Sequence, residues 1–218
     1  MNNMDIINEL KFEFDNSKSI IINTYEFIIL FLEKTDREDR LRTRIIQHTL
    51  RTMKIAEKIL KKEFADRQIV MIALLLHDIG KTLTDSRHDL VSYDIAQIYL
   101  KETNLNDDTQ KRILDCILYH SAKSIKTIKL TPEQQVVMDA DIMDEIGILS
   151  VVKCCLKSQR NKDIDEIINQ MDVVYNKIEK ESEYVQTKYG RELYSQKKNK
   201  LKELLNLLRS EAMMYKIK

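Results

Sequence analysis

The sequence predicts an all-α protein. Only three glycines and one proline occur among the 218 residues, so residues that interrupt helices are rare. Apolar residues make up 43% of the chain and charged residues 33%, a balance typical of a globular rather than a disordered chain. Thr131-Pro132-Glu133-Gln134 is a well-formed helix start, because threonine can cap, proline suits the first helical position and glutamine can close a capping box.

Segments with the apolar spacing of a helix fill the first part of the chain. We expect helices at residues 4–14, 20–32 and 41–60, with a turn at 33–40. Ile69–Leu76 is apolar at every position, and periodicity does not tell a buried strand from a buried helix there. The helical neighbourhood and Gly80, read as a stop signal, favour a central helix that ends near Asp78.

The second part of the chain predicts further helices. They are expected at residues 90–101 and 108–120, then from the Thr131 cap through 136–148, with about three more from 151 to 218. Gly190 is the one strong breaker in the last region. No persuasive boundary divides the chain. We therefore expect a single domain over 1–218, made of a helical extension (1–40), a core (41–152) and C-terminal helices (153–218).

Charge and cysteine content exclude several classes of partner and compartment. A net charge of +1 gives no overall field that would recruit nucleic acid or an anionic membrane. No apolar run approaches the roughly 20 residues of a membrane span, and the first residues lack a signal-peptide pattern. Cys116, Cys154 and Cys155 are odd in number and form no C-x-x-C. We expect a cytoplasmic protein without membrane or nucleic-acid partners, and the oligomeric state stays open.

His77-Asp78 is the feature that points to chemistry. The dipeptide ends the apolar run 69–76. Burying an imidazole and a carboxylate is costly unless something compensates them, and a divalent cation does so directly, since both groups are ordinary ligands of Zn, Fe, Mn or Ni. Adjacent helical residues point about 100° apart. Both can therefore reach one ion only where the helix ends in a shared cavity.

Several motifs in this order resemble one known family. The string Leu-Leu-His-Asp-Ile-Gly-Lys at 75–81 is similar to the signature of the HD-domain superfamily of metal-dependent phosphohydrolases. Further blocks similar to those of the family are His-Thr-Leu-Arg at 48–51, His88 before a helix, Ile-Leu-Tyr-His at 117–120, and the segment 137–147 with Asp139, Asp141 and Asp144. Residues 187–191 resemble a subgroup of uncharacterised bacterial proteins similar to YedJ. The resemblance covers about 43–211 and implies an HD-domain helical bundle with additional C-terminal helices.

The resemblance implies a metal site. Its ligands would be His48, His77, Asp78 and Asp141, and the ion would be a divalent Mn, Fe, Mg, Ni or Zn. Residues two apart on a helix point about 200° apart, so Asp139 is expected to face solvent or cap a helix.

Two further questions stay open at this site. His88 and His120 stand where some relatives hold a second metal, so one or two ions are expected; otherwise both residues would contact phosphate or donate a proton to the leaving group. Asp144 lies within about 60° of Asp141 on a helix. It would either contact a metal ligand, without binding the metal itself, or hold substrate.

The function implied is that of a metal-dependent phosphohydrolase, a phosphomonoesterase or phosphodiesterase. It would act on a nucleotide or other small phosphorylated metabolite through metal-activated water. Asp78 would ligate the metal and orient the water, and Lys81 and Arg51 are candidate phosphate clamps. Three alternatives remain: a metal-containing nucleotide-sensing or binding module without turnover, a di-iron oxygenase, and a helical bundle with incidental histidines.

Overall fold

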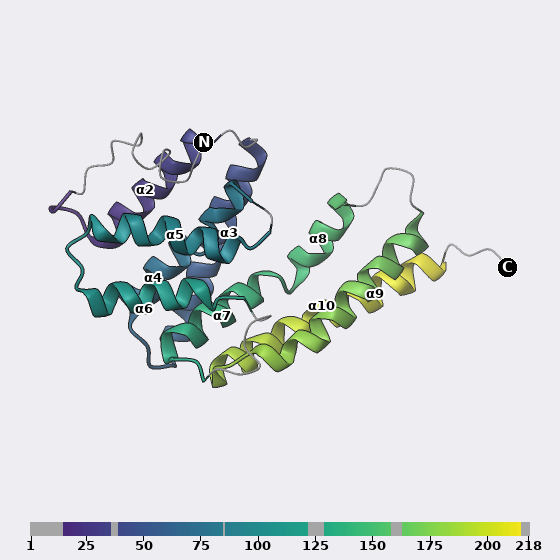
Figure 1. Ribbon diagram of the computed structural model, residues 1–218. Helices are drawn as coiled ribbons and strands as arrows, with labels where there is room; N and C mark the ends of the chain where they lie inside the picture. Colours follow the sequence, from purple (N-terminus) through teal and green to yellow (C-terminus); the bar gives the residue numbers. More distant parts are fainter. Residues whose placement is uncertain (1–14, 36–38, 85, 122–128, 158–162, 215–218) are drawn as a thin grey trace.

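The protein is all-α, as predicted. The computed structural model describes residues 15–35, 39–84, 86–121, 129–157 and 163–214, and within these ranges no strand occurs (Figure 1). The helices of the first part are α2 (Ile20–Lys34), α3 (Asp39–Leu60), α4 (Arg67–Leu76), the short 3-10 helix η1 (Ile79–Thr82), α5 (His88–Lys101), α6 (Asp107–Leu118) and α7 (Pro132–Asp144). The remaining helices are α8 (Ile148–Lys157), α9 (Ile164–Glu181), η3 (Ser182–Tyr184) and α10 (Lys188–Met214). The helix expected at 4–14 lies outside the described residues.

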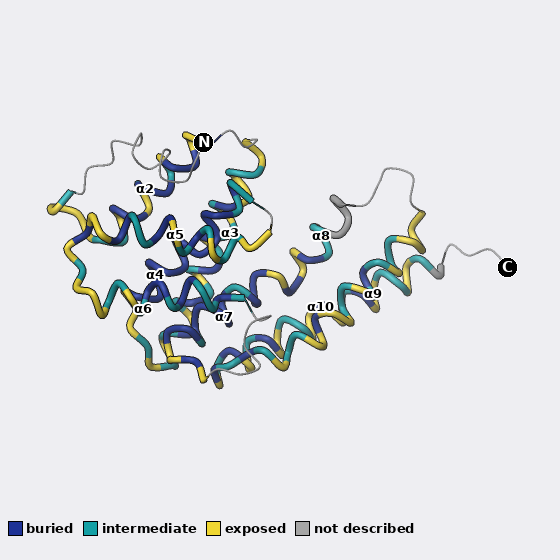
Figure 2. Tube along the Cα trace, in the orientation of Figure 1, coloured by how far each residue is buried: buried dark blue, intermediate teal, exposed yellow. Residues whose placement is uncertain are grey.

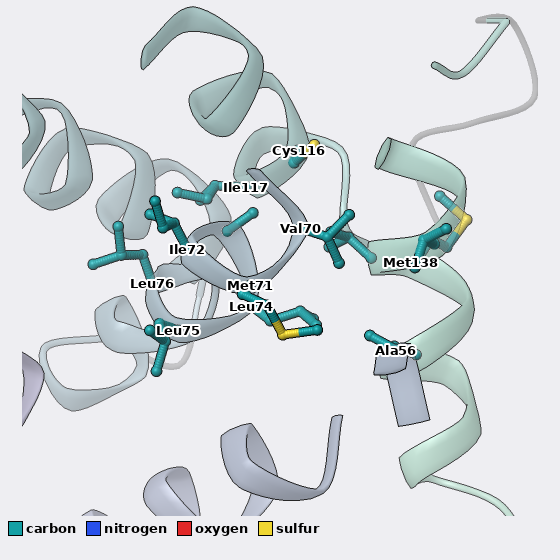
Figure 3. Packing of buried hydrophobic residues seen from close by; sticks show 14 of the residues in the cluster. Ala56, Val70, Met71, Ile72, Leu74, Leu75, Leu76, Cys116, Ile117 and Met138 are labelled. Carbon is teal, nitrogen blue, oxygen red and sulfur yellow. The ribbon is translucent and has the colours of Figure 1, made fainter. Parts of the chain in front are cut away.

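Helix α4 is the centre of the core. Every residue from Ile69 to Leu76 is at most 2% exposed, and Asp66 caps the helix by accepting the N–H groups of Gln68 and Ile69. Figure 3 shows the α4 side chains among Ile117 of α6, Met138 of α7 and other buried residues. The apolar run is therefore a helix that is buried on all sides, which removes the ambiguity between strand and helix.

The other helices form two groups around this core. Helices α2, α3, α6 and α7 pack against α4, and α5 packs against α6 and η1. Helices α9 and α10 run side by side and, with α8, extend away from the α2–α7 bundle (Figure 1). Figure 2 shows that α4 is dark blue from Ile69 onwards, whereas α9 and α10 alternate between buried and exposed residues. Across the described ranges, no helix has both the length and the apolarity needed to cross a bilayer.

The predicted capping box is present at the start of α7. The Thr131 side chain accepts the N–H of Gln134, and the Gln134 side chain accepts the N–H of Thr131. Two helices end earlier than their predicted ranges: α6 ends at Leu118 and α7 at Asp144. The first of these differences places His120 after the helix instead of in it.

Two glycines do not have the role that the sequence suggested. Helix α4 ends at Leu76, close to the predicted end near Asp78, but Gly80 itself lies within η1. A Cβ at Gly80 would come 2.5 Å from the backbone oxygen of His88 and 2.7 Å from the nitrogen of Ser92. Gly190 is no breaker either, because it lies inside α10. A Cβ at Gly190 would collide with Oδ2 of Asp139. Both glycines allow the close approach of another segment.

The prediction that Asp139 faces solvent or caps a helix is correct only in its second part. Asp139 is 0% exposed. Its carboxylate accepts the backbone N–H groups of Gln186 and Thr187 at 2.7 and 2.8 Å, and the Thr187 hydroxyl at 2.6 Å. Because these donors lie just before α10, Asp139 of α7 holds the beginning of the C-terminal helix, where negative charge is favourable.

We expect Gly190→Ala to destabilise the protein by about 1–3 kcal/mol, the usual cost of overpacking a filled site. The effect opposes the higher helix propensity of alanine, which alone would stabilise a helix by about 1 kcal/mol. Urea unfolding measures the difference, with Ser195→Ala at an exposed position of α10 as the control. An alanine variant as stable as the wild type would contradict the close approach of Asp139.

Candidate metal centre

The end of α4 delivers an imidazole and a carboxylate to the interior. His77 follows the last residue of α4 and is 0% exposed, and Asp78, which precedes η1, is 2% exposed. Because the chain leaves the helix at this point, the two neighbouring side chains reach the same region. This is the arrangement that the sequence predicted for His77-Asp78.

Four ligand-type atoms gather on one side of Asp78. Nε2 of His48 lies 3.2 Å from Nε2 of His77, 3.3 Å from Oδ2 of Asp78 and 3.1 Å from Oδ1 of Asp141. Nε2 of His77 lies 3.5 Å from the same Asp78 oxygen and 3.7 Å from the same Asp141 oxygen. Ligands about 2.1 Å from one cation, at tetrahedral or octahedral angles, are themselves roughly 3.0–3.4 Å apart. The spacing therefore fits a cation among them.

A second cluster lies on the other side of the same carboxylate. Nε2 of His88 is 3.3 Å from Nε2 of His120 and 3.4 Å from Oδ1 of Asp78. Nε2 of His120 is 3.8 Å from that oxygen. Oδ1 of Asp78 is buried, yet it makes no hydrogen bond within the described part of the chain. Each oxygen of Asp78 thus faces its own group of imidazoles.

Three of the four histidines are oriented in the same way. A carbonyl or carboxylate oxygen only accepts hydrogen bonds. Nδ1 of His77 therefore donates to the carbonyl of Leu74 at 2.7 Å, and Nδ1 of His120 donates to the carbonyl of Ile117 at 2.6 Å. Nδ1 of His48 donates to Asp144 at 2.9 Å. In the neutral imidazoles the Nε2 lone pairs then point at the two clusters, which is how metal-binding histidines are held.

The charges of the first cluster favour a cation. Burial alone would raise the pKa values of Asp78 and Asp141, but the charges and hydrogen bonds of His77 and His48 hold both pKa values well below the usual range. Burial also opposes charge on His48, yet its hydrogen bonds to Asp141, Asp144 and Asp78 raise its pKa to about 11. In the absence of metal, a proton on His48 therefore supplies the positive charge that these carboxylates require.

Burial disfavours charge on the imidazoles of the second cluster. Burial lowers the pKa of His88, and burial together with the nearby His77 lowers the pKa of His120. A neutral imidazole has a lone pair available for a metal, whereas a protonated one does not. Burial therefore favours the form of His88 and His120 that can bind a metal.

Cationic side chains surround the acidic groups. Arg51 donates to both oxygens of Asp144, from Nε at 2.6 Å and from Nη2 at 2.8 Å. Nζ of Lys81 donates to Oδ2 of Asp78 at 2.5 Å. Nζ of Lys153 lies 3.6 Å from Oδ2 of Asp144. The two predicted phosphate clamps are thus beside the site, with Arg51 held by a carboxylate in a two-point contact.

The structure brings together all six residues that were predicted as ligands. They are His48, His77, Asp78, His88, His120 and Asp141. The helical spacing also separated Asp141, which faces the cluster, from Asp139, which faces α10. Lys153 was not predicted because it lies on α8, outside the motifs, and no motif marks it. That the six residues bind metal remains a prediction.

Comparisons with known proteins match one family model and several solved structures. The family model of the HD domain matches residues 45–146. Bacillus subtilis YpgQ is 20% identical, with a TM-score of 0.62, 88% of this chain covered and 97% of that one. The structure of YpgQ in complex with ADP is also 20% identical, with a TM-score of 0.60 and coverages of 86% and 97%. A predicted HD superfamily hydrolase from an uncultured Thermotogales bacterium is 19% identical, with a TM-score of 0.62 and coverages of 97% and 99%.

These solved structures show a shared fold over most of the chain. No curated protein matches the chain in sequence. The likeness to YedJ-like proteins stays a prediction. The matched segment 45–146 runs from α3 to the turn after α7 and includes every residue of the two clusters. Residues 45–146 therefore form an HD domain.

Proposed function

We propose that this protein is a metal-dependent phosphohydrolase that acts on a nucleotide or another small phosphorylated metabolite. One observation carries the proposal: a single buried carboxylate, Asp78, stands between two imidazole clusters, and its Oδ1 has no hydrogen-bond donor in the described residues. An unpaired buried carboxylate oxygen is costly. Cations on both sides of Asp78 would remove that cost.

The ligand sets fit first-row divalent metals. His48, His77, Asp78 and Asp141 would hold one ion, and Asp78, His88 and His120 would hold a second. Mixed imidazole and carboxylate sets suit Mn, Fe, Zn or Ni, while Mg prefers oxygen ligands alone. Among the metals expected from the sequence, Mn and Fe thus fit these sets better than Mg.

A bound divalent cation lowers the pKa of its water and draws charge from a phosphoryl oxygen. The chain itself supplies the surroundings for this chemistry. The side chains of Asp141 and His88 are 24% and 23% exposed, so solvent and substrate can approach the clusters from their side. Asp78 is only 3% exposed and is held by Lys81, so its position is fixed before substrate arrives.

Two cationic side chains beside the clusters would have different roles towards the substrate phosphate. Lys81 is 38% exposed, and its flexible ammonium group can exchange Asp78 for a phosphoryl oxygen. Arg51 is 33% exposed, and its planar guanidinium is already oriented by Asp144. We therefore propose that Lys81 contacts the phosphate directly, and that Arg51 acts chiefly by holding Asp144.

A nucleotide substrate is suggested by one protein of the same fold. Bacillus subtilis YpgQ, which shares the fold, was solved in complex with ADP. No residue of this chain identifies a base or a sugar. We accordingly propose nucleotides as the first substrates to assay, alongside simple phosphomonoesters and phosphodiesters.

The function is tested with the chelator-treated protein, reloaded with Mn²⁺ or Fe²⁺ and assayed for phosphate or pyrophosphate release from such a panel. We expect hydrolysis only after reloading. Asp78→Asn should lower the rate by at least about 100-fold, since changes behind a metal ligand already cost roughly 10- to 100-fold. The exposed Asp94→Asn of α5 is the matched control. Metal-loaded wild type that binds nucleotide without hydrolysing any substrate would contradict turnover.

Metal binding should release a proton from His48. Its pKa of about 11 means that the metal-free site is protonated near neutral pH, so the metal must displace that proton. Apparent affinity should therefore rise about tenfold for each pH unit between pH 6 and pH 8, for one displaced proton. Calorimetric titration with Mn²⁺ in buffers of different ionisation enthalpy counts the released protons. An affinity independent of pH would show that His48 is not a ligand.

A further inference from the structure

The end of α7 is held by a lysine from outside the matched domain. Nζ of Lys197, on α10, donates to the carbonyl of Met143 at 2.8 Å and to the carbonyl of Ile146 at 3.3 Å. The last carbonyls of a helix have no partners within the helix, and a cation there is also favoured by the helix dipole. Lys197 thus supplies both a donor and a charge to the end of α7.

This contact requires a partly buried amine and an unusual backbone conformation. Lys197 is half-buried, and burial lowers the pKa of its amine. The turn after α7 also needs Gly147, whose φ of +103° is unfavourable for other residues. A cation placed out of solvent beside a glycine turn fixes the carbonyls that it binds.

The segment fixed in this way carries the acidic half of the first cluster. Asp141 is two residues before Met143, and its Oδ1 lies 3.1 Å from Nε2 of His48. Asp144 is the next residue after Met143, and its Oδ2 accepts Nδ1 of His48 at 2.9 Å. A shift at the end of α7 would therefore move one predicted ligand directly and turn the imidazole of another.

Helix α10 holds α7 at two points that bracket Asp141. Asp139 accepts the N–H groups of Gln186 and Thr187 before α10 begins, and Lys197 binds the carbonyls after Asp141. In the first contact a side chain of α7 binds the backbone just before α10. In the second, a side chain of α10 binds the backbone at the end of α7. Together they leave α7 little freedom to slide or rotate past α10.

We propose that Lys197 is a positioning residue of the metal centre. It lies outside residues 45–146, and through the last turn of α7 it sets the places of Asp141 and Asp144. The inference rests on the metal centre proposed above. It extends that centre to the C-terminal helix, which the HD-domain match does not include.

The test compares Mn²⁺ binding by the full chain and its variants. Lys197→Met should weaken Mn²⁺ binding roughly 10- to 100-fold, as changes behind a metal ligand do, and should reduce the rise in unfolding temperature that Mn²⁺ produces. Lys197→Arg keeps the charge and the donors, so it should recover part of the affinity. The exposed Lys200→Met on the same helix should behave like the wild type.

The Mn²⁺-induced rise separates positioning from a purely structural role. If Lys197→Met only lowers the unfolding temperature, and the wild-type affinity and Mn²⁺-induced rise are kept, the inference is wrong although the metal centre stands. If the wild type binds no Mn²⁺, both the metal centre and the inference are wrong. If Lys197→Met does not fold, Lys197→Gln, which keeps a neutral donor group, takes its place: weakened Mn²⁺ binding supports the inference, and wild-type affinity overturns it.

Discussion

A buried carboxylate at the end of an apolar helix is the constraint on which the site depends. Helix α4 is enclosed on all sides, so the residues that follow it emerge in the interior. An ionised carboxylate there requires positive charge or donors. On one side of Asp78, the protonated His48 supplies that positive charge when no metal is bound. On the other side, His88 and His120 approach Oδ1 but leave it without a hydrogen bond in the described residues, so the need is met on one side alone.

Much of this arrangement was predictable because it follows from local patterns. The apolar run, the Thr131 capping box and the helical angle between Asp139 and Asp141 are properties of short segments, and the structure agrees with each. The roles of Gly80 and Gly190 were misjudged. Gly80 allows the close approach of α5, the next helix, and Gly190 allows the close approach of Asp139, which is distant in the sequence. A local turn rule contains no information about such neighbours.

The C-terminal helices were the least predictable part of the site. Lys153 and Lys197 belong to a lysine-rich region in which most cations face solvent, and nothing in their local sequence separates them from the others. Their importance arises only from where α8 and α10 meet the end of α7. Helices α8–α10 extend from the bundle (Figure 1), yet they contact the candidate metal centre through α7, the helix that supplies Asp141 and Asp144.

The central claim is that Asp78 is shared by two cations. Crystals of the Mn²⁺-loaded protein, measured at a wavelength where manganese scatters anomalously, test it most directly. We expect two anomalous peaks, one among His48, His77 and Asp141 and the other between His88 and His120, with Asp78 bound to both. A single peak that leaves Oδ1 of Asp78 without a ligand, or no peak near Asp78, would contradict it.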